Sequence, residues 1–152
     1  MILPDFKAFP AMGRIIGVDW GARRCGLAVS SADREFVFVR PAIVMARGDN
    51  DVARRVADFA TDENAVGIVV GLPLHGDGTE SETTQMVRDF AQKLCVYVDL
   101  PICFIPENLT SHAAQMEMGR VRVRDLKSQL DSNAARIILE NAIALMRRQQ
   151  KI

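Results

Sequence analysis

The chain has 152 residues, 49% hydrophobic and 25% charged, which is ordinary for one soluble globular domain. No apolar run approaches the roughly 20 residues that span a bilayer, and residues 1–12 lack the basic and apolar regions of a signal peptide, so we expect a cytoplasmic protein with no membrane partner. Nineteen basic residues balance nineteen acidic ones, which excludes a uniformly basic nucleic-acid binder but allows one with segregated charge.

The first part of the chain predicts an extension followed by three strands. Pro4 and Pro10 oppose regular structure, so residues 1–13 should form a loose N-terminal extension before a single domain over 14–148. Pro41 should lie at a sheet edge or a bulge. Short apolar runs joined by short turns favour an antiparallel meander of three strands, at 14–21, 25–30 and 36–44.

Helices and strands then alternate. A helix is expected over 50–62, with Asp49 or Asn50 as its N-cap, and the apolar run 65–73 is typical of a central parallel strand. Thr79 and Glu82 predict a capping box for the next helix. That helix should carry Met86, Phe90 and Leu94 on one face.

The last third predicts one more strand and two helices. The strand is 101–107, and Thr110 or Ser111 could cap a short helix. Ser128 and Asp131 resemble a capping box for the final helix, whose inward face should hold Ala134, Ala135, Ile138, Ala142 and Leu145. The order predicts an α/β fold: a mixed five-stranded sheet, three antiparallel strands then parallel ones, with helices on both faces.

Three acidic residues stand out by position. Asp19 interrupts an apolar strand, where an unpaired carboxylate costs desolvation energy, although a turn or edge placement would also explain it. Glu107 ends the fifth predicted strand, the end at which open α/β sheets bind ligands, but alone it could be a solvated loop acid. Asp131 shares a helix face with core alanines, or is a first-turn acid favoured by the helix dipole.

Together these carboxylates suit Mg²⁺ or Mn²⁺, with two ions expected. A two-metal site stabilises the attacking and leaving oxygens of a phosphodiester, and it would let clustered acids accept a polyanion. Spacing alone does not select these three residues from nineteen acids.

Several motifs together resemble the YqgF/RuvX family of RuvC-like proteins, within the RNase H-like superfamily. The stretches are IIGVDWGARRCGLAVS, IVVGLPLHGDGTE, VRDFAQKL, ENLTS and DSNAARIIL, and the likeness covers about residues 14–146. The resemblance implies an RNase H-like fold and maps the family's catalytic and metal-binding triad onto Asp19, Glu107 and Asp131. One departure is Asn108, where many relatives have Arg.

The resemblance implies a nuclease that hydrolyses RNA phosphodiesters, in maturing the 5′ end of pre-16S ribosomal RNA, with the small ribosomal subunit as a further partner. A resolvase of four-way DNA junctions and a non-catalytic nucleic-acid-binding module remain alternatives, and the sequence shows no dimer face. An actin-like ATP-binding protein would need two lobes, for which 152 residues are too few.

Other residues are candidates for substrate contact. Phosphates of the substrate could contact Arg23 and Arg24, although these two could instead be solvated turn residues. A second basic stretch, with Arg122, Arg124 and Lys127, could bind phosphates from a flexible loop. His75 could contact substrate from a glycine-bearing loop. In contrast, Trp20 should pack in the core rather than on a base, Asp77 should form a turn, and Cys25, Cys95 and Cys103 should be free.

Overall fold

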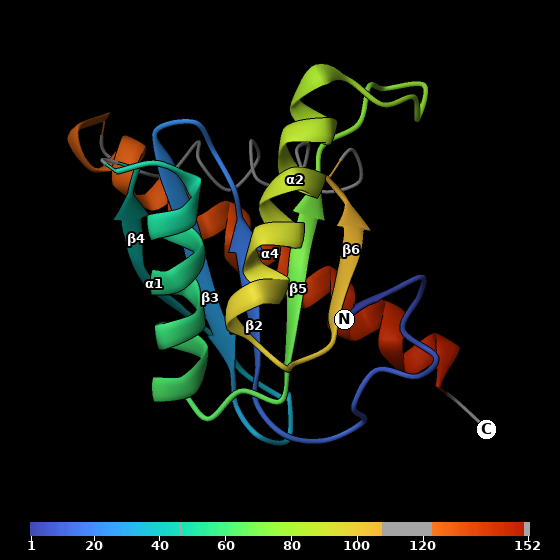
Figure 1. Cartoon of the computed structure of the whole chain (residues 1–152). Coiled ribbons are helices and arrows are strands. Elements are labelled where there is room, and N and C mark those ends of the chain that lie inside the picture. Colours follow the sequence, from blue (N-terminus) through green and yellow to red (C-terminus); the bar gives the residue numbers. More distant parts are fainter. Residues whose placement is uncertain (46, 108–122, 151–152) are drawn as a thin grey trace.

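The computed structural model describes residues 1–45, 47–107 and 123–150, with the backbone alone for 123–132. These residues form a six-stranded sheet in the order β1-β6-β5-β2-β3-β4. Helices α1 (Asp49–Asp62) and α2 (Glu82–Tyr97) cover one face, and α4 (Val123–Gln149) crosses the other (Figure 1). The strands are β1 (Ile2–Leu3), β2 (Ile15–Asp19), β3 (Arg24–Ser30), β4 (Val37–Val44), β5 (Gly67–Leu72) and β6 (Ile102–Pro106).

The strand pairing confirms the predicted mixed α/β sheet. β2, β3 and β4 form the antiparallel meander, and β5 and β6 run parallel to β2. β4 is an edge strand, and its register against β3 shifts between Cys25 and Leu27. Pro41 lies opposite that shift, so the edge and the bulge expected for this residue are both confirmed.

The N-terminal segment packs more firmly than its prolines suggest. Ile2 pairs with Ile102, which makes β1 the sixth strand, so the prediction of five strands is one short. Phe6 and Phe9 are buried in edge-to-face contact, and the Gln150 side-chain amide donates to both of their carbonyl oxygens. The expected looseness is wrong, because two aromatic side chains bury enough apolar surface to hold an otherwise irregular segment.

Two helices begin earlier than the sequence patterns indicate. α1 follows Gly48, which has no side chain to cap it, so the expected caps Asp49 and Asn50 lie inside the helix. α4 begins at Val123, so Ser128 and Asp131 lie within it and do not form a capping box. Residues 123–127 include Arg, Leu and Lys, which are good helix formers, and they extend the helix rather than forming a loop.

α2 begins later than predicted. Its N-cap is Ser81, which forms a capping box with Thr84, whereas Thr79 and Glu82 do not cap the helix. Phe90 and Leu94 are buried, whereas Met86 is 49% exposed, so the buried face of α2 does not include Met86. Among the described residues, no helix is long and apolar enough to cross a membrane.

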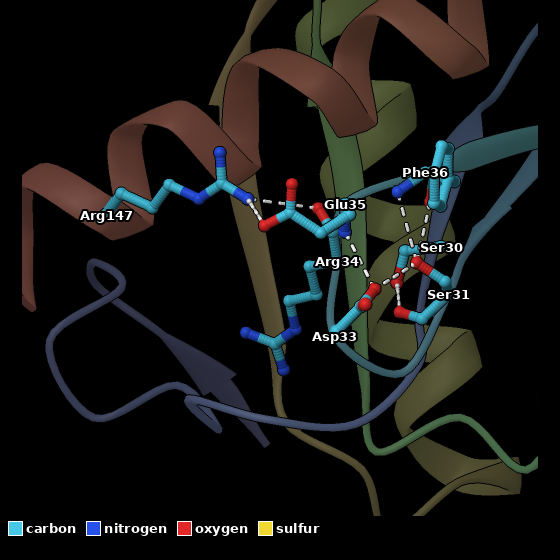
Figure 2. Close-up of polar contacts among 7 residues, drawn as sticks. All are labelled: Ser30, Ser31, Asp33, Arg34, Glu35, Phe36 and Arg147. Carbon is cyan, nitrogen blue, oxygen red and sulfur yellow. Dashed lines mark hydrogen bonds and ion pairs between the residues drawn. The ribbon is translucent and has the colours of Figure 1, made fainter.

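The turn between β3 and β4 fixes the far end of α4 (Figure 2). Arg34 adopts a positive φ of 62° and its buried guanidinium donates to the Gly13 carbonyl oxygen at 2.9 Å and to the Met146 sulfur at 3.6 Å. Arg147 donates to the Arg34 carbonyl oxygen and pairs with Glu35. The last turns of α4 therefore lie beside the amino end of β2.

Candidate active site

Three strands end side by side at the candidate site. β2, β5 and β6 are parallel neighbours, with Val18 opposite Val70 and Gly71 opposite Ile105. Their carboxyl ends therefore meet at one edge of the sheet (Figure 1). This is the edge at which open α/β sheets bind their ligands.

Asp19 is the last residue of β2 and faces α4. Successive side chains on a strand point to opposite faces, and Ile15 belongs to the core beneath α4. Gly17, two residues on, lies against the backbone of α4 at Ala135. Asp19 continues this series, so its half-buried carboxylate lies on the α4 face of the sheet.

Glu107 follows β6 directly and lies on the same face. Cys103 and Ile105 pack in the core beneath α4, and Glu107 is the next residue of that alternation. Its Oε1 and Cγ lie 2.8 and 2.9 Å from the point where a Cβ on Gly71 would stand. The side chain therefore lies over β5, the strand between β6 and β2, and it is directed toward the strand that carries Asp19.

The backbone of α4 brings residue 131 to this end of the sheet. Met146 lies near the amino end of β2, through Arg34, whereas Ala135 lies over Gly17. The amino-terminal end of α4 therefore points toward the carboxyl end of β2. Asp131 comes one helical turn before Ala135, a rise of about 5–6 Å. Its side chain lies outside the described residues, as does Asn108.

Asp19 and Glu107 provide the kind of donor set that hard divalent cations prefer. Mg²⁺ and Mn²⁺ bind carboxylate oxygens and keep open positions for water and phosphate. Within residues 1–45, 47–107 and the described side chains after 132, no three His, Cys, Asp or Glu side chains form a metal-binding group. Two carboxylates on one face fit the metal site predicted here, and the third predicted ligand, Asp131, is not among these side chains.

The negative charge of Asp19 also affects the pKa of a buried neighbour, Cys25. Burial, followed by the charges of Asp19 and Asp49, raises the pKa of the Cys25 thiol well above its usual range. Cys25 and Cys103 are buried and all three cysteines are free, as predicted.

Trp20 packs on the face opposite to Asp19, as expected for a core residue. Its indole N–H donates to Oδ1 of Asp49 at 3.1 Å, and its ring lies 6.5 Å from that of Phe90. Asp49 also pairs with Lys93 at 3.6 Å. The residue after Asp19 is thereby tied to the first residue of α1 and to α2.

The loop after β5 lies at the edge of the sheet where Asp19 and Glu107 lie. Its ends are joined by a bridge between Leu74 and Glu80, and the buried Thr84 hydroxyl donates to the Pro73 carbonyl oxygen. Asp77 accepts from the hydroxyl and the backbone N–H of Thr79, which lower the pKa of the Asp77 carboxyl. Asp77 is thus the turn former that was predicted.

The predicted substrate-binding residues are only partly brought together. His75 lies exposed in the loop after β5. Arg23 lies in the turn after β2 and Arg24 begins β3, at the same edge as Asp19. Arg124 and Lys127 belong to the first turns of α4, so the loop expected there is wrong at these positions. Arg122 lies outside the described residues.

Sequence patterns alone did not single out Gly71 as a site residue. It belongs to the apolar run 65–73 that was predicted as a central strand, and in the structure the space left by its missing Cβ holds the Glu107 side chain. A glycine inside an otherwise fully apolar strand was the available signal, because such a residue often marks the close approach of another group.

Comparisons with known proteins identify a family and close relatives in sequence. A family model described as "RuvX: Holliday junction resolvase" matches residues 13–145. A protein of Maridesulfovibrio salexigens named "Putative pre-16S rRNA nuclease" is 40% identical over 134 residues, covering 86% of this chain and 98% of that protein. A protein of the same name from Orientia tsutsugamushi is 34% identical, with 95% and 92% covered.

Solved structures show the same fold at low sequence identity. RuvC of T. thermophilus, in complex with a Holliday junction substrate, gives a TM-score of 0.60 at 12% identity, covering 91% of this chain and 97% of that one. The yeast mitochondrial Holliday junction resolvase Ydc2 gives 0.52 at 12% identity, with 94% and 82% covered. The resemblance found in the sequence motifs is confirmed: the chain belongs to the RuvX family of nucleases.

Proposed function

We propose that this protein is a divalent-metal-dependent nuclease that hydrolyses phosphodiester bonds of RNA, in maturing the 5′ end of pre-16S ribosomal RNA in the cytoplasm. The observation that carries the proposal is the position of Asp19 and Glu107 on one face of the sheet, with Glu107 over Gly71. The names of the two relatives support pre-16S ribosomal RNA as the substrate, and the small ribosomal subunit is proposed here as a partner.

The residues of the chain would act mainly by position and charge. Asp19 and Glu107, with Asp131 from α4, would hold the metal. Bound divalent ions would supply an acidified water and positive charge for the phosphodiester. The strand ends hold the carboxylates on a rigid edge, which avoids reorganisation during the reaction.

The proposal is tested with Asp19→Asn and Glu107→Gln. Both are nearly isosteric and remove one negative charge, so the fold should persist while cleavage of a pre-16S RNA fragment with Mg²⁺ or Mn²⁺ falls by at least a hundredfold, the order of one electrostatic catalytic contact. The matched control is Asp62→Asn, an exposed acid at the far end of α1, which should leave the rate unchanged. Full metal-dependent cleavage by Asp19→Asn would refute the metal assignment.

A second candidate is a resolvase of four-way DNA, which the description of the matching family model favours. Incubating the protein with a four-way DNA junction and with the RNA precursor, at equal concentration and metal, separates the two. Binding of both substrates without cleavage of either would instead indicate a non-catalytic binding module.

A further inference from the structure

A second charged feature lies at the same end of the molecule as the carboxylates. β4 runs parallel to β2, because each is antiparallel to β3, so the segment from β4 to α1 begins at the edge where Asp19 lies. The backbone N–H of Met45 in this segment donates to the Arg23 carbonyl oxygen at 2.9 Å. This contact joins the segment to the turn that follows Asp19.

Arginines gather in a hollow where this segment enters α1. The hollow has a volume of about 320 Å³ and is lined by Arg47, Asp51, Arg54 and Arg55. All three arginines are exposed. In a chain with no net charge, three cations against one carboxylate make this a locally positive surface.

Asp51 pairs with two of the three arginines. Its carboxylate lies 2.8 Å from Arg54 and 3.9 Å from Arg55, and Arg54 also approaches the exposed Asp58 at 3.8 Å. The Arg54 and Arg55 side chains in these pairs are 54% and 45% exposed, so water weakens the pairs and the guanidinium groups can also bind a stronger acceptor. A phosphate with several oxygens is such an acceptor, because guanidinium binds it through paired N–H donors.

The hollow is held at a fixed place relative to the candidate site. Trp20, directly after Asp19, donates to Asp49, the first residue of α1, and Asp51 lies two residues further in that helix. A strand whose reacting phosphate lay at the carboxylates could thus extend over the start of α1.

We propose that the hollow lined by Arg47, Arg54 and Arg55 binds a backbone phosphate of the same polynucleotide, away from the bond that is cleaved. The inference rests on the proposed function in taking a polynucleotide as the ligand. It adds a site with contacts to phosphate only, which positions the strand without reading its sequence. The acidic residues at the strand ends repel a polyanion, and this site would offset that repulsion.

The test measures the affinity for a fluorescein-labelled single-stranded RNA by anisotropy, without divalent ions and over a range of salt concentrations. Loss of the one phosphate contact made by the hollow should lower the slope of log affinity against log salt by about 0.7, the value per neutralised phosphate of a single strand. We expect this change in R47Q/R54Q/R55Q, together with an affinity at least about tenfold lower at low salt.

The control K7Q/R14Q/R148Q removes the same charge from three exposed residues outside this edge, in the N-terminal segment, before β2 and in the last turn of α4. It should keep the wild-type slope. Circular dichroism would confirm that both variants fold. If the two triple variants lose affinity equally, binding follows net charge and the hollow is not a site. If the wild type binds neither RNA nor four-way DNA, the proposed function itself fails.

Discussion

The Oε1 atom of Glu107 lies 2.8 Å from the point where a Cβ on Gly71 would stand. Real Cβ atoms are not found this close to an oxygen, so Gly71→Ala must displace the carboxylate or the strand. We expect cleavage to fall by at least tenfold, because small misplacements of catalytic groups are costly. Overpacking should also lower the free energy of unfolding by about 1–3 kcal/mol.

A second variant separates the two effects of Gly71→Ala. The new methyl group also meets Cδ1 of Ile138, which Ile138→Val removes. G71A/I138V should therefore recover part of the stability in urea unfolding but stay slow in cleavage. Recovery of activity together with stability would show that Gly71 serves packing and not the position of Glu107.

Gly17 allows α4 to approach β2. A Cβ there would lie 2.9 Å from the Ala135 carbonyl oxygen and 2.9 Å from the Leu139 Cβ, two neighbours that cannot rotate away. Gly17→Ala should lower the free energy of unfolding by about 1–3 kcal/mol. The control is Gly76→Ala, where a Cβ meets nothing within 4 Å and the change should be within about 0.5 kcal/mol. Equal stability of the two variants would contradict the close approach.

The hydrogen bond between Trp20 and Asp49 should stabilise the strand end that carries Asp19. Trp20→Phe keeps an aromatic ring near Phe90 but loses the 3.1 Å bond, which should cost about 1 kcal/mol in urea unfolding. Asp49 keeps its ion pair with Lys93, so it is not left without a partner. An unchanged free energy of unfolding would show that this contact contributes nothing.

Cys103 should make stability depend on alkaline pH. Burial, followed by the charge of Asp5, raises the pKa of the Cys103 thiol from 9.0 to about 12. Above pH 9 the unfolded chain loses this proton and the folded protein keeps it, so the free energy of unfolding falls as pH rises. Urea unfolding at several pH values should show a flatter decline for Cys103→Ala, although that variant is less stable overall. Parallel declines would refute the assignment.

Local patterns predicted most of the fold, because they depend on neighbouring residues. Alternation and apolar runs identified five strands, and Pro41 indicated both the edge and the bulge. Helix starts were less accurate: Thr79 was chosen as a cap although Ser81 caps α2. Several Ser, Thr and Asp residues can cap a helix in principle, and packing of the whole helix selects among them.

The sequence by itself determined the family, the order of the elements from β2 to β6 and the carboxylates worth considering, since motifs and periodicity are properties of the chain alone. Only the tertiary structure decided that Glu107 lies over Gly71, that Asp131 is inside a long helix, and that Arg47 shares a hollow with Arg54 and Arg55. These relations join residues distant along the chain, and they arise from strand pairing and helix packing, which no local pattern encodes.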